Sequence, residues 1–243
     1  IQNSENSGSP FVQWNRGVEL AEGSLVWIAE SDDVARSDFL ERLVAKFDER
    51  SDLVLAWCQS RRICEDGRES DLILTGNGDL WERDFVCRGS DAIDAHIGCF
   101  CSIPNISSAL FRRDAYLASG GADLSFRMAA DWKLYLKMFS SSRPVAFLAS
   151  DLNLHRSHPA TVRQVHSSDG WALSEVFDVI FWAKQSGRIS GKVFSRTRDF
   201  WFRAWLVNHR PQLGFSGNLR VSKSASMVSR TRAIMGLIVC VFK

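Results

Sequence analysis

The sequence has no long apolar run, little net charge and few cysteines. Its most apolar stretch, 233–242, is far shorter than the ~20 residues that a membrane-spanning helix needs. The net charge is only +2, which argues against a broadly basic surface for nucleic acid. Six cysteines among 243 residues are too sparse for a disulfide framework. With 45% hydrophobic and 24% charged residues, the composition is that of an ordinary globular protein.

The cysteines allow one alternative to free thiols. Cys87, His96, Cys99 and Cys101 lie close together in the sequence and are of the residue types that bind zinc. Their spacing matches no common zinc site, so we favour buried free thiols in a reducing cytoplasm. No signal peptide is visible. The first residue is Ile1 rather than Met, so we expect an internal part of a longer, cytoplasmic protein.

Hydrophobic periodicity predicts an alternation of strands and helices. Short apolar runs predict strands at 24–29, 52–58, 106–111 and 145–148. Apolar residues at helical spacing predict helices at 11–21, 38–48, 112–119 and 131–139. The near-continuous run at 24–29 predicts a strand that is buried on both faces, and residues 65–95 are expected to add little to the core. The fold class is therefore α/β with a largely parallel sheet.

The composition changes at about residue 166. Two amphipathic helices are predicted beyond it, at 171–184 and 197–209, and residues 210–243 contain Lys and Arg but no acidic residue. We therefore divide the chain into a catalytic unit, 1–165, and a helical basic tail, 166–243. One interpretation places the tail on an anionic membrane surface. We favour the other, in which the tail helices cover the sheet.

The most informative motif is the acidic run Glu30-Ser31-Asp32-Asp33, which follows directly after the strand at 24–29. In open α/β sheets, ligands bind beyond the carboxyl ends of the strands. Three carboxylates this close repel one another, and Mg²⁺ or Mn²⁺ would relieve the repulsion because both ions prefer oxygen ligands. The alternative is an acidic turn that caps the next helix, and on this motif alone the two interpretations carry equal weight.

Two further elements carry candidate chemistry. Asp131 begins a predicted helix after a Gly-Gly turn, and it is either the N-cap of that helix or a general base beside Trp132. His155, Arg156 and His158 suit a diphosphate or a metal, because Arg offers a charged fork and His can bind a metal. Taken alone, the N-cap and a solvent-exposed basic loop are the favoured interpretations of these two elements.

Several segments must be taken together, in order along the chain. They are Asn6–Pro10, Trp14–Gly17, Ala21–Gly23, Trp27–Asp33, Asn105–Arg113, Gly120–Asp123, Asp131–Trp132 and Arg156–His158. Each is weak evidence by itself, but the ordered set resembles the family 2 glycosyltransferases of the GT-A fold. The resemblance covers residues 6–165.

The resemblance implies a role for each candidate residue. Glu30-Ser31-Asp32-Asp33 looks like the family's DxD-type motif, which contacts the donor's ribose, its diphosphate and the metal. Asp131 matches the catalytic base. The other implied roles are donor binding by Asn15, Gly17, Glu30, Asp32 and Arg156, an acceptor side at Asn105, Asp123 and Trp132, and metal binding by Asp32, Asp33 and His158.

The resemblance also implies that part of the family pattern is missing. Members of this family normally open with a strand, a helix and a second strand that bind the nucleotide base. The resemblance here begins just before the third strand of that pattern. We therefore expect the C-terminal part of a GT-A domain, without the base-binding strands and with a C-terminal helical extension.

The expected function is that of an inverting glycosyltransferase. It would move a sugar from a nucleotide-diphosphate donor to a glycan or lipid-linked acceptor of the cell envelope, with Mg²⁺ or Mn²⁺ as cofactor and peripheral contact with the inner face of the membrane. The alternative is a non-catalytic remnant that serves as a binding or scaffold module. A metal-dependent phosphoryl-transfer enzyme is a third interpretation, which the lack of a Gly-rich phosphate loop disfavours. No nucleic-acid partner is expected.

Overall fold

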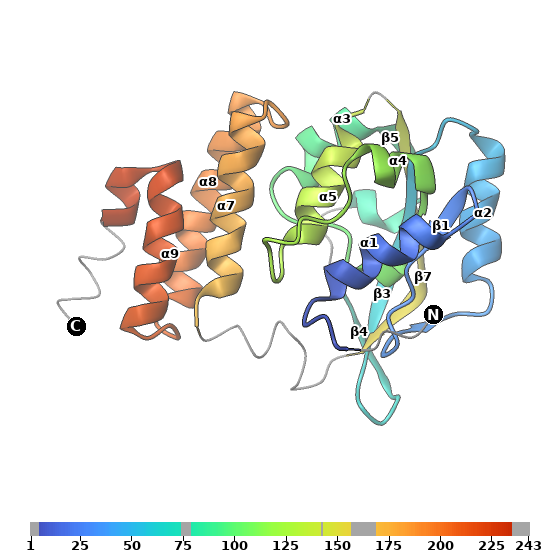
Figure 1. Cartoon of the computed structure of the whole chain (residues 1–243), viewed down its shortest axis with the longest axis horizontal. Helices are drawn as coiled ribbons and strands as arrows, with labels where there is room; N and C mark the ends of the chain where they lie inside the picture. The colour runs from blue at the N-terminus through green and yellow to red at the C-terminus, as the bar shows by residue number, and fades with distance from the viewer. Residues whose placement is uncertain (1–4, 74–78, 142, 157–168, 235–243) are drawn as a thin grey trace.

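The computed structural model describes residues 5–73, 79–141, 143–156 and 169–234 (Figure 1). Its α-helices are α1 (Pro10–Leu20), α2 (Phe39–Glu49), α3 (Gly89–Ala92), α4 (Arg113–Ala118), α5 (Ala130–Phe139), α7 (Trp171–Gln185), α8 (Gly191–Ala204) and α9 (Phe215–Val228). Its strands are β1 (Leu25–Trp27), β2 (Val34–Ala35), β3 (Leu55–Ile63), β4 (Glu69–Leu72), β5 (Phe85–Arg88), β6 (Ala109–Arg112) and β7 (Pro144–Arg156). Short turns of other helix types are η1 (Asp79–Glu82), η2 (Ile93–Ile97), η3 (Ile106–Ser108) and η4 (Trp205–His209).

The helices predicted before the tail are confirmed. α1 begins at Pro10, whose fixed φ suits the first turn of a helix, and it buries Phe11, Trp14 and Val18 along one face. α2 likewise buries every third or fourth residue, at Phe39, Leu43 and Phe47. In both helices the apolar spacing seen in the sequence is the spacing of the buried face.

The prediction of a largely parallel sheet was wrong. The main strand order is β1-β6-β3-β7-β2, with β4 beside β3 and β5 beside β7. Among the described strands only β3 and β7 pair in parallel, and the other pairs are antiparallel. β1, β3 and β7 run in the same direction, but β6 lies between β1 and β3 and runs against both. A hydrophobic pattern along one strand carries no information about which strand pairs with it.

β1 also differs from the fully buried strand that the sequence predicts. It lies at one end of the main strand order, where it pairs with β6. Of its residues only Val26 is buried, whereas Leu25 and Trp27 are half-buried. The strand that leads into the acidic motif is therefore a short edge strand.

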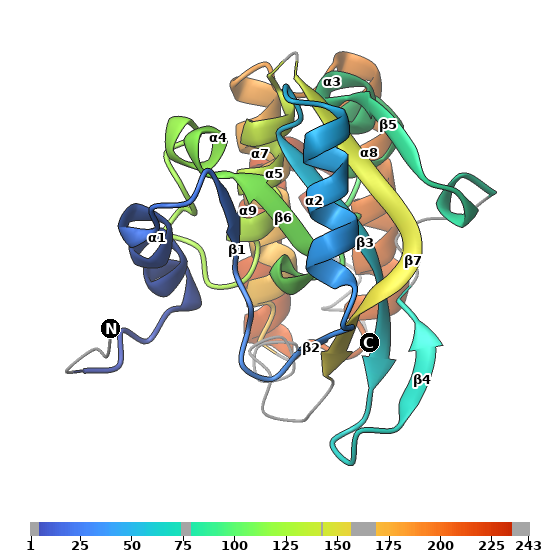
Figure 2. The ribbon, with the colours of Figure 1, turned by 90° about the vertical axis from the view of Figure 1, so that its right-hand side faces the viewer.

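The central strands bury opposite faces in two hydrophobic layers. Ala56 and Cys58 of β3 face α2, and that layer includes Phe39 and Leu43. The alternate residues of the same strands, such as Trp57, belong to the second layer, which also includes buried residues of α1, α5 and the tail helices. Figure 2 shows α2 in front of the sheet and α5 behind it. This alternation follows from the two-residue repeat of a strand. The core also extends into residues 65–95, where Trp81 and Ile93 are buried, contrary to our expectation for that segment.

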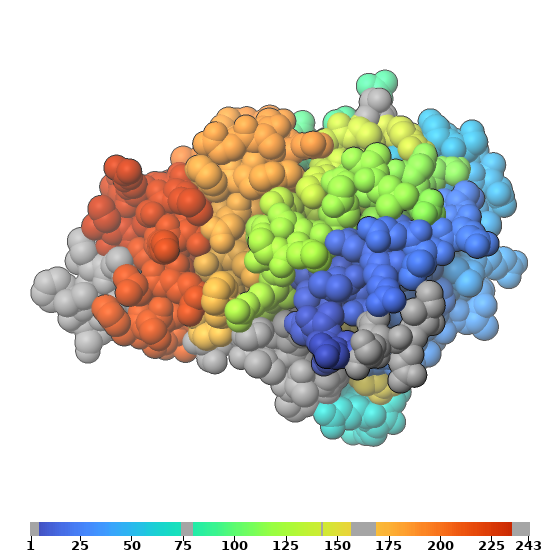
Figure 3. Space-filling model, viewed as in Figure 1, coloured from blue at the N-terminus to red at the C-terminus, as the bar shows by residue number. Residues whose placement is uncertain are grey.

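The favoured interpretation, in which the tail helices cover the sheet, is wrong. α7 packs beside α5, so that α5 lies between the sheet and the tail helices (Figure 1). The predicted helix at 197–209 starts earlier, as α8, and ends in η4, and α9 was not predicted. Phe177, Phe202 and Trp205 belong to the same buried cluster as Trp57 of the sheet. Figure 3 shows the tail surface continuing directly into the rest of the molecule.

The cysteines that the structure describes are free thiols, as favoured, but they are not uniformly buried. Among the cysteines in the described ranges, Cys58 and Cys99 are buried, whereas Cys87 and Cys101 are half-buried and Cys64 is exposed. Burial raises the pKa of Cys58 to about 12 and that of Cys87 to about 11, so both stay protonated at neutral pH. No helix within the described residues is long and apolar enough to cross a bilayer.

The shared core predicts that the tail and the sheet unfold together. Phe177 is fully buried and its ring packs on Phe202 and Trp205, so Phe177→Ala should destabilise the whole protein by about 3–5 kcal/mol. Phe215→Ala is the matched control, because Phe215 is 66% exposed, and it should cost less than about 0.5 kcal/mol. Chemical denaturation followed by Trp fluorescence and circular dichroism measures both. Two separate transitions in the parent protein would contradict the single core.

Candidate functional site

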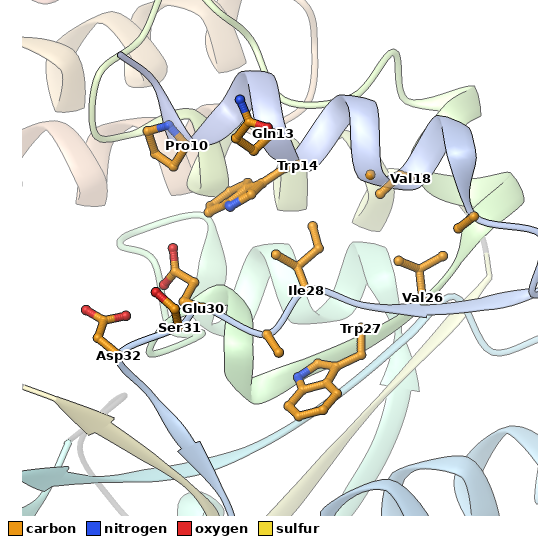
Figure 4. Close-up of a pocket in the computed structure, with 13 residues that line it drawn as sticks. Pro10, Gln13, Trp14, Val18, Val26, Trp27, Ile28, Glu30, Ser31 and Asp32 are labelled. Carbon is orange, nitrogen blue, oxygen red and sulfur yellow. The ribbon is translucent and has the colours of Figure 1, made fainter. Parts of the chain in front are cut away.

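A pocket of about 600 Å³ lies between α1 and β1 and reaches the acidic motif (Figure 4). Trp14 of α1 points toward Glu30, and Val26 and Ile28 point up toward α1. Trp27 points to the opposite side of the strand, where its Nε1 donates to the carbonyl of Ser107 at 2.9 Å. The pocket thus has an apolar wall and, at one end, the acidic residues. Its full lining is Pro10, Gln13, Trp14, Gly17, Val18, Ala21, Val26, Trp27, Ile28, Ala29, Glu30, Ser31 and Asp32.

Glu30 has the most strongly perturbed carboxyl group of the acidic motif. Burial, and then the charges of Asp33 and Asp32, raise the pKa of Glu30 from 4.5 to about 7. Asp131 adds to the same effect, which means that its charge acts on Glu30 across the site. A cation or a hydrogen-bond donor placed here would relieve this repulsion.

Asp33 points away from the pocket into a buried polar network. Its side chain is 3% exposed. One carboxylate oxygen accepts from the backbone N–H of Arg156 at 3.0 Å and lies 3.1 Å from Nδ1 of His155. The other oxygen accepts from the side-chain amide of Asn105. Burial would raise the pKa of Asp33, but the hydrogen bonds from His155 and Arg156 outweigh it, and the pKa falls below 3.8.

The network continues beneath Asp33 into the sheet. The Oδ1 atom of Asn105 accepts from Nδ2 of Asn153 at 2.9 Å and from Oγ of Ser60 at 3.2 Å. Asn105 is 7% exposed, and both of its partners are fully buried. Buried polar groups of this kind are stable only when they are hydrogen-bonded to one another. Asn105, predicted on the acceptor side, therefore lies under Asp33 and joins the acidic turn to β3 and β7.

Arg156 is likewise engaged by the protein. Its Nε donates to the carbonyl of Asp32 at 2.9 Å, and its Nη1 donates to the carbonyls of Cys64 and Glu65 at 2.9 and 3.2 Å. The guanidinium thus fastens the acidic turn to the loop after β3. His158, the third predicted metal ligand, lies outside the described residues.

Of the two predicted residues of α1, the pocket includes only Gly17. Asn15 uses its side-chain amide to bind the turn before α5 instead. Its Nδ2 donates to the carbonyl of Ala122, and its Oδ1 accepts from the N–H of Ala122, both at 2.9 Å, and from the hydroxyl of Tyr116 at 2.6 Å. A Cβ at Gly121, where φ is +69°, would lie 2.6 Å from Asn15 Oδ1. Glycine is therefore required there for both space and backbone conformation.

Asp131 is not the N-cap of its helix. α5 begins at Ala130 with Ala129 as N-cap, so Asp131 occupies the second helical position. There its Oδ1 accepts from the backbone N–H of Trp132 at 2.6 Å. The side chain is half-buried, and its charge contributes to the raised pKa of Glu30. The carboxylate of Asp131 is therefore near enough to the acidic motif for its charge to act on Glu30.

The other two predicted acceptor-side residues make structural contacts. Trp132 is 3% exposed and donates from Nε1 to the carbonyl of Ile97 at 2.6 Å. Asp123 pairs with Nζ of Lys133 at 2.6 Å. Burial would raise the pKa of Asp123, but the hydrogen bonds from Lys133 and Ser125 outweigh it and lower the pKa to about 2. This ion pair ties the loop before α5 to the helix itself.

Sequence reasoning missed three residues that shape this site. Trp14 forms part of the pocket wall, but no site role was assigned to it from the sequence, although it lies in a segment that carries the resemblance. Tyr135 is fully buried, and among the described residues its hydroxyl has no hydrogen-bond partner, while the charges of Asp131 and Glu30 act on it. Glu175 of α7 is buried and binds the backbone that leads into α5. A lone Glu in an amphipathic helix gives no sequence signal of such a contact.

The acidic motif has the chemistry of a divalent-metal site but only part of a ligand set. Within the described ranges no three His, Cys, Asp or Glu side chains are arranged to hold an ion. Asp33 is enclosed by its own hydrogen-bond donors, whereas Glu30 and Asp32 line the pocket. Two carboxylates at a pocket fit an ion that takes its other ligands from a diphosphate and water.

Comparisons with known proteins agree with this geometry. A family model described as Glycosyl transferase family 2 matches residues 1–115. S. aureus TarS 1-349 in complex with UDP-GlcNAc has a similar structure, with a TM-score of 0.61 and 13% sequence identity over 96% of this chain. A second crystal structure of TarS 1-349 has a TM-score of 0.59 and 13% identity, and the match covers 97% of this chain and 71% of the TarS chain. For the TarS 1-349 complex with UDP, the TM-score is 0.56 and the identity 13%, and the match covers 98% of this chain and 71% of the TarS chain. A search of curated proteins returns no match.

The fold is that of the GT-A glycosyltransferases, and residues 1–115 match the model of glycosyltransferase family 2. It spans 65% of the first TarS structure. The α/β class and the GT-A fold expected from the resemblance are confirmed, although the sheet is mixed and not largely parallel.

The enclosed position of Asp33 predicts that substitution of two adjacent aspartates changes the stability of the protein by different amounts. Asp33→Asn should destabilise the protein by about 2–4 kcal/mol, because it places an amide against the donors of Asn105 and Arg156. Asp32→Asn is the control and should change stability by less than about 0.5 kcal/mol, because its side chain lines the pocket. Urea unfolding measures the free energy of unfolding of both variants. Equal values would contradict a stabilising role for the hydrogen bonds of Asp33.

The lowered pKa of Asp33 also predicts a pH dependence. Because the folded pKa lies below the ordinary value of 3.8, the carboxylate stabilises the fold above that value, and the contribution is lost as the pH falls through the folded pKa. The unfolding free energy of the parent should therefore fall on acidification from about pH 5 to about pH 2. The same titration of Asp33→Asn should be flatter, and parallel curves would remove Asp33 as a source of acid sensitivity.

Proposed function

We propose that this chain contributes the chemical centre of an inverting glycosyltransferase that uses a nucleotide-diphosphate sugar. The observation that carries the proposal is that the charge of Asp131 in α5 helps to raise the pKa of Glu30 after β1, although the two residues lie far apart in the sequence. The match to the family 2 model supports glycosyl transfer, and the TarS complexes with UDP-GlcNAc and UDP are consistent with a nucleotide-sugar donor. The acceptor is proposed to be a glycan or a lipid-linked sugar.

The donor diphosphate would bind at the acidic end of the pocket. Glu30 and Asp32 would hold the ion there, and a bound Mg²⁺ or Mn²⁺ would neutralise charge on the leaving nucleoside diphosphate. Gly17 and Trp14 would border the donor from α1. Asp33, Asn105 and Arg156 would act indirectly, by fixing the backbone of the acidic turn.

Asp131 would act as the general base. It would take the proton from the acceptor hydroxyl while that oxygen attacks the anomeric carbon, and the bond to the donor diphosphate would break as the new bond forms. One displacement inverts the configuration at that carbon. A half-buried carboxylate on a rigid helix suits this role, because the helix keeps it at one position relative to the donor.

The general-base role predicts a severe and selective defect in Asp131→Asn. Asn keeps the size of the side chain, and Ala129 rather than residue 131 is the N-cap, so the fold should survive. Because Asn accepts no proton, transfer should slow by about 10²- to 10⁴-fold, while binding of the nucleotide sugar stays within about twofold. Initial rates and calorimetry on the complete protein provide the two readouts. Transfer within a few-fold of the parent would return Asp131 to a structural role.

The metal role predicts that Asp32→Asn and chelation have the same effect. In the parent, EDTA should weaken binding of UDP or a UDP sugar by about tenfold or more, and Mg²⁺ or Mn²⁺ should restore it. In Asp32→Asn the affinity should already be low and should not respond to either treatment. Calorimetry with the four combinations tests this, and an affinity that is the same with and without EDTA in the parent would exclude a metal at Asp32.

A further inference from the structure

Glu175 makes a contact that the chemistry above does not use. It belongs to α7 in the tail and is 4% exposed. Its Oε1 accepts from the backbone N–H of Arg127 at 2.7 Å, and its Oε2 accepts from the N–H groups of Met128 and Ala129 at 2.8 and 2.9 Å. One carboxylate therefore binds three consecutive backbone amides.

These three amides lead directly into α5, the helix that carries Asp131. Ala129 is the N-cap of α5 and has no side chain that can cap it, so Glu175 supplies the cap from another element. A negative charge at a helix N-terminus is favourable, because the unpaired amides there carry partial positive charge. Hydrogen bonds to a carboxylate are also shorter and stronger than neutral ones. The buried charge of Glu175 is thus fully engaged at the start of one helix.

The same loop has two further contacts with α7. The guanidinium of Arg127 lies 4.3 Å from the centroid of the Trp171 ring, and Nζ of Lys133 lies 4.9 Å from that of Trp182. Lys133 in turn pairs with Asp123 at the other end of the loop. Residues 127–129 and Lys133 of α5 are therefore fixed to α7, and Glu175 is the most buried polar group among these contacts.

We propose that Glu175 is a positioning residue for the proposed base Asp131. By fixing Ala129, two residues before Asp131, its carboxylate sets where the first turn of α5 stands relative to the acidic motif after β1. The tail thereby becomes part of the catalytic apparatus and is more than a cover for the core. This inference rests on the proposed function, since it concerns the group that accepts the acceptor's proton.

Three variants in the complete protein test the proposal. Glu175→Gln keeps the size but replaces one acceptor oxygen by an NH₂ group that faces the loop amides. Glu175→Asp keeps the charge on a shorter side chain. Asp178→Asn is the matched control: it removes a half-buried carboxylate one turn further along α7, and the amides of residues 127–129 donate to Glu175 and not to Asp178.

The expected result is a loss of turnover without a loss of donor binding. Glu175→Gln should lower kcat by about 10- to 100-fold, because a base displaced by about 1 Å loses that much rate, and should leave donor affinity within about twofold. Glu175→Asp should recover part of kcat, and Asp178→Asn should keep it within about twofold. Amide hydrogen exchange at residues 127–129 should accelerate in Glu175→Gln and not in the control.

Three outcomes would overturn the inference, and they can be told apart. If Asp131→Asn is inactive but Glu175→Gln keeps the parent kcat, Glu175 only docks the tail and the proposed function stands. If Asp131→Asn transfers sugar like the parent, the proposed base is wrong, and the positioning role falls with it. Loss of kcat in Asp178→Asn equal to that in Glu175→Gln would also contradict the proposal, because it would indicate general loosening of α7.

Discussion

The burial of the Asp33 carboxylate is the constraint on which the arrangement of the site depends. A charge that is 3% exposed is tolerated only when donors surround it, and here the donors come from His155, Arg156 and Asn105. Those residues stand at the end of β7 and before β6, far from Asp33 in the sequence. Satisfying one carboxylate therefore joins the turn after β1 to two other parts of the sheet. Glu30 and Asp32 line the pocket, while the hydrogen bonds of Asp33 hold the acidic turn in place.

A second buried carboxylate does the same for the opposite side of the site. Glu175 binds the amides before α5, as Asp33 binds the end of β7. In both places a side-chain carboxylate accepts hydrogen bonds from backbone N–H groups, which in loops and at helix ends often have no backbone carbonyl as partner. The two proposed reacting regions, Asp131 and the acidic motif, are thus each fixed by an acid that is itself shielded from solvent. Between them lies a shared core in which sheet and tail residues pack together.

Much of the local structure was predictable from the sequence. The helices at Pro10–Leu20 and Phe39–Glu49 follow from apolar residues at helical spacing, and β3 and β7 follow from apolar runs. The acidic motif and Asp131 were recognised because their order along the chain resembles a known family. The roles expected for Asn15, Asn105 and Arg156 stay predictions, and the structure adds that each residue has polar atoms hydrogen-bonded within the protein. A polar residue in a family motif looks the same in sequence whether it faces a ligand or supports its neighbour.

The sequence by itself determined the helices α1, α2, α4 and α5, the strands β1, β3, β6 and β7, and the resemblance to a family, since these follow from spacing and order along one chain. It did not determine that β6 runs between β1 and β3, or that α7 rather than a turn residue caps α5. Those features depend on contacts between residues far apart in the sequence, and a local pattern of residues carries no information about such contacts. The sequence marked Asp32 and Asp33 as equals, but only the tertiary structure separated them, because burial and hydrogen-bond donors from β7 reach one carboxylate while the other lines the pocket.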